Sequence, residues 1–202
     1  VGTPVVCNDE NGCTDDTCAP ATGECVYTNA PNPCEDGSVC TVNDVCGPMF
    51  SEYFDGVTPP AIPAGWTTTL VQGLAGDIAF QTVTTFFDTA PNAAWTDDPT
   101  HVTDKVLDSP PIAVSATNYQ VTFKHRYDLE STYDGAVLEI SIAGGPFQDI
   151  LAAGGTFVSG GYTGTISSSY QNPLGGRQAW TGSSSVFLAP VVNLPVAAYD
   201  QT

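Results

Sequence analysis

The sequence predicts an all-β fold in which a β-sandwich follows a small, disulfide-rich module dominated by loops. Two observations point to the sandwich. Short runs alternate apolar and polar residues, which is the period of a β-strand, and turn residues such as Gly, Pro, Asn and Asp separate the runs. A third observation points to the module, because all seven cysteines fall between residues 7 and 46.

The chain is therefore expected to have three parts. Residues 1–6, VGTPVV, are an apolar N-terminal extension and a candidate donor strand. Residues 7–47 form the cysteine-rich module, and residues 48–202 form the sandwich. So short a module cannot bury enough apolar surface to fold unaided, and disulfides are the usual remedy.

The cysteines form an internal repeat with short spacings, and such crowding indicates disulfides and an oxidising compartment. We predict three disulfides within residues 7–46, with Cys25 or Cys46 left over. Cys25 has no counterpart in the second copy, and Cys46 adjoins the missing position. Zinc is not expected, because the spacing does not fit a zinc ribbon and both histidines lie far away. The two copies contain Cys7, Cys13, Cys18 and Cys25, then Cys34, Cys40 and Cys46.

Each copy also carries acidic and amide side chains that fit two interpretations. Oxygen ligands at alternate positions, as in Asp9 and Asn11, resemble calcium loops. Asp, Asn and Gly are equally typical of tight turns. The candidate calcium ligands of the module are Asp9, Asn11, Asp15, Asp36 and Asp44.

The sandwich is organised around residues 119–142, which read as two strands with an acidic loop between them. From Tyr119 to Tyr127 the odd-numbered positions form an apolar face and the even-numbered positions a polar one. His125 lies on the apolar face, where a hydrogen-bonded core histidine is expected. The loop closes at the turn pair Asp134–Gly135, and the second strand spans residues 137–142. Further short strands are predicted at 67–71, 78–87, 186–188 and 196–199, a polar loop at 88–103, and a turn at 143–146.

Two resemblances to known families rest on these residues. The run CTDDTC, residues 13–18, resembles the short CTDC-type cysteine-rich repeats of secreted microbial proteins. The runs FSEYFDG, PAGW, YxVTFKHRY, YDGAVLEIS and GRQAWTG resemble adhesin-type and MAM-like jelly-roll modules of secreted bacterial proteins. The second resemblance covers residues 50–194 and implies that the β-sandwich has jelly-roll topology.

The jelly-roll resemblance implies two further features. In such modules a calcium ion often joins the first strand to a neighbouring loop. The family pattern also continues beyond the region of Leu194 with further strands, whereas this sequence stops at Thr202. Either the sequence is partial or those strands come from elsewhere. The resemblance implies Glu52 and Asp104 as the calcium ligands, with Asp55, Asp108 and Asp134 as weaker candidates.

Charge and motifs limit the function. The sequence has four Lys and Arg residues and 22 Asp and Glu residues. The resulting net charge of −18 disfavours nucleic acid and anionic lipid as partners. No apolar run approaches a membrane span, so membrane insertion is not expected. HExxH and GxSxG motifs are absent, and no aromatic-lined groove can be assigned to the acidic pair Glu130 and Asp134. We therefore predict a non-catalytic protein.

The predicted function is that of a secreted or cell-surface structural or adhesive protein, stabilised by calcium and disulfides. Its copies are expected to form a homo-oligomer or filament through strand edges, with residues 1–6 of one copy completing the sheet of the next. The alternative is a non-catalytic accessory domain of a larger secreted hydrolase that binds carbohydrate or protein. Its candidate ligand contacts are Trp95, Tyr162 and Trp180.

Overall fold

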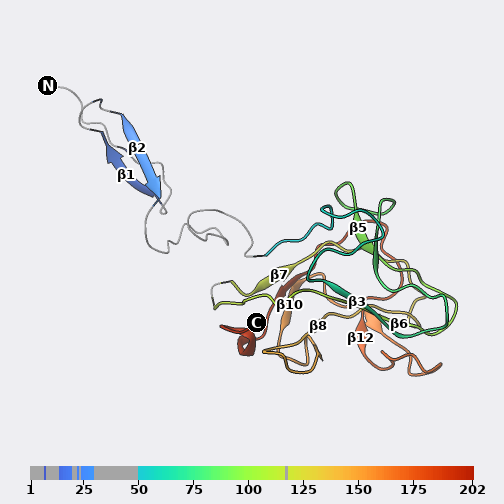
Figure 1. The fold of residues 1–202 in the computed structure, drawn as a ribbon. Helices are drawn as coiled ribbons and strands as arrows, with labels where there is room; N and C mark the ends of the chain where they lie inside the picture. Colours follow the sequence, from blue (N-terminus) through green and yellow to red (C-terminus); the bar gives the residue numbers. More distant parts are fainter. Residues whose placement is uncertain (1–6, 8–13, 20–21, 23, 30–49, 117) are drawn as a thin grey trace. The chain divides into compact units, whose positions relative to one another are not determined.

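The computed structural model describes residues 7, 14–19, 22, 24–29, 50–116 and 118–202, and these residues confirm the all-β fold class (Figure 1). Within them short strands and loops alternate, and the one helical element is a single 3-10 turn. None of the described residues belongs to a helix that is long and apolar enough to cross a membrane. The chain divides into two compact units, Val1–Ser51 and Glu52–Thr202.

The first unit contains an antiparallel hairpin of β1 (Thr14–Cys18) and β2 (Cys25–Asn29). A disulfide joins Cys7 to Cys25, with their Cα atoms 5.4 Å apart. Of the two cysteines predicted to be left over, Cys25 is therefore ruled out. A disulfide depends on which cysteines lie close together in the fold, and the order of cysteines in the repeat does not determine this. Cys46, the other candidate, lies outside the described residues, as do residues 1–6, Cys13, Cys34 and Cys40; the side chain of Cys18 is not described either.

The second unit contains a three-stranded antiparallel sheet with β13 (Val191–Asn193) at its centre. Strand β10 (Thr156–Ser159) lies on one side of β13 and β7 (Gln120–Thr122) on the other. Val121 stands opposite Val192, which is fully buried. These strands therefore carry part of the core.

The segment around β7 follows the predicted period of two. From Tyr119 to Tyr127 the odd-numbered residues are half-buried and the even-numbered residues are exposed. Beyond β7 the pairing continues through isolated bridges from His125 to Leu188 and from Asp128 to Ser183. The prediction of an inward-facing apolar stripe is confirmed.

The two strands predicted within residues 119–142 do not pair with each other. Strand β8 (Glu139–Ile140) pairs instead with β9 (Gln148–Asp149). A turn closes this hairpin, in which Gly145 N donates to Ile142 O over 2.9 Å. Its central residues, Ala143 and Gly144, have φ angles of 51° and 73°, as a type I′ hairpin turn requires. The predicted turn at 143–146 is confirmed, and its tightness explains why β9 is the partner of β8.

Two further strand pairs lie earlier in the chain. Strand β3 (Thr67–Gln72) pairs with β6 (Asp104–Asp108), and this confirms the predicted strand at 67–71. Strand β4 (Gln81–Val83) pairs with β5 (Ala93–Trp95), so the predicted strand at 78–87 is much shorter. The predicted polar loop at 88–103 contains β5 and is wrong there, because two alanines give a weak β signal.

The centre of the second unit is aromatic. Trp180 follows β12 (Gln178–Ala179), which pairs with β11 (Gly164–Thr165). The indole is surrounded edge-on by the rings of Phe123, His125, Phe157 and Tyr162, with centroids 4.7–5.7 Å away. Apart from Pro63, Pro190 and Pro195, the buried apolar side chains of the described residues are Ile150, Ile166, Ala179, Trp180, Val192 and Ala198.

The predicted strand at 196–199 is wrong. Residues Val196–Ala198 form the 3-10 helix η1, in which Ala198 N donates to Pro195 O over 2.8 Å. Pro195 sets the backbone direction at the start, and two alanines follow that favour helical over extended backbone. Past this turn Gln201 forms an antiparallel bridge with Val114.

Candidate functional site

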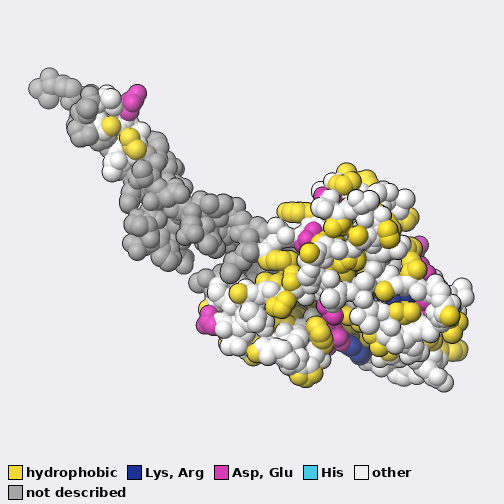
Figure 2. Space-filling view, viewed as in Figure 1, with side chains coloured by type: hydrophobic (Ala, Val, Ile, Leu, Met, Phe, Trp, Pro, Cys, Tyr) yellow, Lys and Arg dark blue, Asp and Glu magenta, His cyan; other side chains and the backbone are white. Residues whose placement is uncertain are grey.

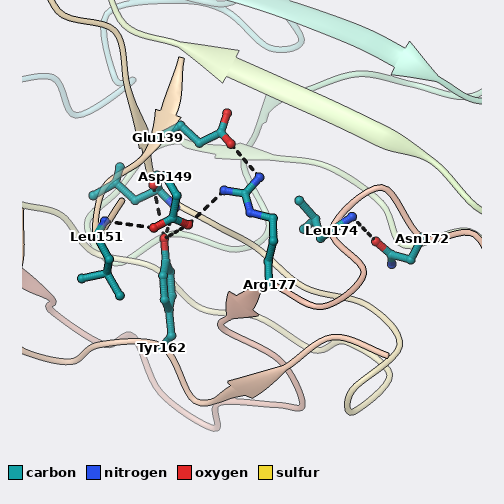
Figure 3. A network of polar contacts seen from close by, with 8 residues as sticks. Glu139, Asp149, Leu151, Tyr162, Asn172, Leu174 and Arg177 are labelled. Atoms are coloured by element: carbon teal, nitrogen blue, oxygen red, sulfur yellow. Dashed lines mark hydrogen bonds and ion pairs between the residues drawn. The ribbon is translucent and has the colours of Figure 1, made fainter. Parts of the chain in front are cut away.

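A network of charged side chains joins the β8–β9 hairpin to the chain just before β12 (Figure 3). Arg177 Nη1 donates to Glu139 Oε1 over 2.7 Å, and Nη2 donates to Asp149 Oδ2 over 2.9 Å. Glu139 and Asp149 are directly opposite each other in the hairpin. Like charges in that position destabilise a strand pair, and the guanidinium between them removes the repulsion.

The carboxylate of Asp149 accepts further hydrogen bonds. Its Oδ1 accepts from Leu151 N over 2.9 Å, and Tyr162 Oη lies 3.1 Å from Oδ2. The same hydroxyl accepts from Leu138 N over 3.1 Å. Burial raises the pKa of Tyr162 well above its usual range, so the phenol stays protonated and serves as a donor.

Burial alone would lower the pKa of Arg177, but its hydrogen bonds and the charges of Asp149 and Glu139 raise it overall. An open hollow of about 420 Å³ adjoins the network. Because its polar side chains already bind one another, we interpret the network as a clamp that holds the hairpin. The hollow is lined by Asp149, Leu151, Ala152, Arg177 and Gln178.

The aromatic candidates for ligand contact lie mostly inside the fold. Trp180 is only 2% exposed, and its Nε1 donates to Gly160 O over 2.9 Å. The prediction that its ring faces a ligand is wrong, because four other aromatic rings surround it. Tyr162 is half-buried and engaged by its hydroxyl, and Trp95 is half-buried in β5.

His125 lies on the inward face, as predicted, but its environment differs from the expected one. Its Nε2 is buried and has no hydrogen-bond partner among the described residues. Aromatic rings pack around it, namely Phe123, Tyr127 and Trp180. Burial lowers the pKa of His125, because the charged imidazolium is poorly solvated there.

Two of the predicted calcium ligands accept hydrogen bonds from the backbone. Glu52 Oε1 accepts from Phe54 N over 2.6 Å, and Asp55 Oδ1 accepts from Asn92 N over 3.0 Å. Asp104 and Asp108 lie at the two ends of β6, and Asp134 follows the turn at Glu130. In the part of the chain that the structure describes, no three His, Cys, Asp or Glu side chains gather in a metal-binding group.

The acids of the cysteine-rich module are not placed. Asp9, Asn11, Asp36 and Asp44 lie outside the described residues, and the side chain of Asp15 is not described. Calcium binding therefore stays a prediction. Sequence reasoning did not select Asp98, whose pKa is raised by burial and then by its neighbours Asp134, Asp97 and Glu130. The only sequence signal was the Asp97–Asp98 pair in a polar loop.

Strand β3 forms an open sheet edge. Within the described residues it pairs only with β6, and five of its six residues are exposed. Residues 67–76 carry no charge in a chain of net charge −18, and Val71 is 60% exposed. Natural edge strands are usually protected by lysine, proline or a bulge. Here the protection is one irregularity between Leu70 and Gln72, which leaves residues 67–70 as a regular edge.

Figure 2 shows hydrophobic side chains dispersed over the visible face of the second unit, with acidic side chains between them and few basic ones. An uncharged strand edge is therefore a place where two acidic surfaces can meet with little repulsion between them. This makes β3 the candidate interaction surface of the described residues.

Comparisons with known proteins return no match: no protein-family model, no curated protein and no solved structure matches this chain. The resemblances to CTDC-type repeats and to MAM-like jelly rolls therefore rest on the sequence alone and stay predictions.

Proposed function

We propose that this chain is a structural or adhesive protein of the extracellular space or the cell surface, whose copies associate through strand edges. The observation that carries the proposal is the open edge of β3, which is regular, uncharged and exposed. An exposed edge presents unpaired backbone N–H and C=O groups that another extended segment can pair with.

The cysteine-rich module supports the extracellular part of this proposal. Disulfides persist in oxidising environments, and the bond from Cys7 to Cys25 fits the crowding of seven cysteines before residue 47. Calcium is proposed as a further stabilising ligand, bound by the acids of the module.

The partner of β3 determines the form of the assembly. Pairing of β3 with residues 1–6 of another copy would use two different surfaces, so it would be head-to-tail and give a filament. Pairing of β3 with β3 would use one surface twice and close as a dimer. We propose the first arrangement, because the sequence of residues 1–6 is uncharged and largely apolar.

Two lysines on β3 test the proposal. We expect the Thr69→Lys/Val71→Lys variant to remain monomeric in analytical ultracentrifugation and electron microscopy, whereas the parent chain forms filaments. Lysine on an edge strand disfavours pairing without removing core contacts. The Val186→Lys/Val196→Lys variant adds the same charge at exposed positions outside β3 and should still assemble.

Deletion of residues 1–6 separates the two arrangements. Under the proposal the truncated chain no longer forms filaments. Dimers that survive this deletion but not the β3 lysines would indicate β3–β3 pairing. A parent chain that stays monomeric at every concentration would overturn assembly through β3.

The accessory-domain alternative has less support. Two of its three candidate contacts, Trp180 and Tyr162, have their rings or polar atoms engaged within the fold.

A further inference from the structure

Two tyrosines form an exposed aromatic pair at the surface of the second unit. Tyr133 is 39% exposed and Tyr170 is 74% exposed. Their rings meet edge to face, with centroids 5.4 Å apart and planes at 68°. Large aromatic side chains are usually drawn into the core, and this pair leaves one ring open to solvent although the two rings contact each other.

Hydrogen bonds hold the two loops that carry the pair together. Ser167 N donates to Thr132 O over 2.7 Å, and Asn172 Nδ2 donates to Tyr133 O over 2.6 Å. The turn before Tyr133 is closed by a bond from Tyr133 N to Glu130 O over 3.0 Å. The Tyr133–Tyr170 pair is therefore preorganised by contacts that do not involve the exposed ring faces.

The backbone at the pair is also unusual. Thr132, Tyr170 and Gln171 have φ angles of 68°, 67° and 60°. They make up half of the six described non-glycine residues with positive φ. This conformation is unfavourable for a β-branched or bulky residue, and such residues concentrate at functional sites.

Charge selects the kind of ligand. Glu130 and Asp134 flank Tyr133 in the sequence, and no lysine or arginine lies between residues 127 and 176. The pKa of Asp98 is raised by burial and by Asp134, Asp97 and Glu130, and Lys105 lowers it, so four carboxylates and one ammonium group form a region of net negative charge. An aromatic face in an anionic region attracts cations, whereas anions are repelled.

We propose that the Tyr133–Tyr170 pair binds the basic side chains of a protein partner, with a guanidinium or ammonium group on the exposed ring of Tyr170 and the carboxylates of the adjacent turn as counter-charge. The site does not involve β3. It adds a ligand to the proposed adhesive role, and it can be confirmed or refuted whether or not the chain assembles through β3.

Binding of a hexa-arginine peptide to the full chain at 0.15 M salt tests this proposal, with isothermal titration calorimetry as the measurement. We expect Tyr170→Ala to weaken binding by roughly two- to fivefold, the range of an exposed cation–π contact. Tyr170→Phe should retain binding, because the ring is kept. Since neither substitution changes the charge, the general attraction of an acidic chain for a basic peptide is the same in all variants.

Tyr53→Ala is the matched control, because Tyr53 is 64% exposed and lies outside both loops. It should bind the peptide as the parent chain does. Equal affinities of the Tyr170→Ala and Tyr53→Ala variants, with unchanged circular dichroism, would overturn the site. A neutral hexasaccharide run in parallel should show no binding that depends on Tyr170; if it does and the peptide does not, the pair recognises a glycan and the proposal is wrong.

Discussion

At Gly135 the backbone passes so close to two core side chains that a larger residue does not fit. A Cβ atom placed there would lie 2.6 Å from Ile166 Cδ1 and 2.9 Å from Ala179 Cβ. The end of the Ile166 side chain can rotate away, but the Ala179 methyl group is fixed to its strand. The glycine of the Asp134–Gly135 pair is thus required for packing.

We expect Gly135→Ala to lower the free energy of unfolding by about 1–3 kcal/mol, the usual effect of overpacking a core. Urea denaturation followed by tryptophan fluorescence measures it. Gly56→Ala is the control, because a Cβ there meets no atom within 4 Å. Equal stabilities of the two variants would contradict the close packing at Gly135.

His125 makes the fold sensitive to acid. Its pKa is lowered by burial, so the folded chain excludes a proton that the unfolded chain accepts. Its contribution to stability therefore falls as the pH drops below about 6.5, the ordinary value for histidine. The fall ends once the pH is below the pKa in the folded state.

Replacing His125 by Phe keeps an aromatic ring among Phe123, Tyr127 and Trp180 and removes the titrating group. We expect the difference in unfolding free energy between the His125→Phe variant and the parent chain to grow in favour of the variant as the pH falls below about 6.5. Denaturation series at several pH values measure it. A difference that is constant with pH would show that His125 titrates alike in both states.

Among the elements, the β8–β9 hairpin depends on a residue that belongs to neither strand. Arg177 lies between Glu139 and Asp149 and compensates both charges (Figure 3). We expect Arg177→Met to lower the unfolding free energy by roughly 1–2 kcal/mol, because two charge-assisted hydrogen bonds are lost at a partly exposed site.

Arg177→Met combined with Glu139→Gln should recover part of this loss, since the repulsion across the hairpin is then removed. Lys124→Met is the control: Lys124 Nζ is 4.0 Å from Asp88 Oδ2 on the surface, and its loss should matter little. Thermal unfolding of the parent chain, the Arg177→Met and Glu139→Gln variants and the double variant measures the cycle. A double variant no more stable than Arg177→Met would refute the compensating role.

The same elements show what sequence patterns can predict. The alternation from Tyr119 to Tyr127 depends only on the period of a strand, and the structure confirms it. The partners of a strand depend on residues far along the chain, so the local pattern could not pair β7 with β13. The strand prediction at residues 196–199 was wrong for a related reason. The β-branched and aromatic residues at the two ends favour a strand, whereas the two alanines between them favour the helical turn that forms after Pro195.

The candidate site was predicted less well than the fold. Trp180 and Tyr162 were candidate ligand contacts of the accessory-domain alternative, but aromatic rings suit a core equally well. Burial separates the two cases, and burial follows from long-range packing. The sequence predicted β3 as a strand, but it could not predict that β3 has a single neighbour among the described residues.

For the whole molecule, calcium stays a proposed stabilising ligand, and the acids of the cysteine-rich module are its proposed site. Glu52 and Asp55 each accept a hydrogen bond from a backbone N–H group through one carboxylate oxygen. We expect a chelator to lower the melting temperature by several degrees, because a ligand at a hundredfold excess over its Kd stabilises the folded state by about 2.7 kcal/mol.

This response should persist in the Glu52→Gln variant and be reduced by Asp9→Asn combined with Asp36→Asn. Differential scanning calorimetry with and without chelator measures it. Identical melting curves in both conditions would rule out calcium as a stabilising ligand.

The pairing of β7 with β13 has a consequence for how quickly the fold can form. Val121 and Val192 are opposite each other in the sheet although 71 positions separate them in the chain. Closing so long a loop costs entropy before the contact is made, and folds with many distant contacts reach the native state in milliseconds to seconds. During synthesis, the backbone from Tyr119 to Tyr127 meets the strand partners that the structure describes only once residues 183–194 have emerged. If the chain is exported, as its proposed function requires, this delay leaves a time window in which it can cross a membrane before its sheet closes.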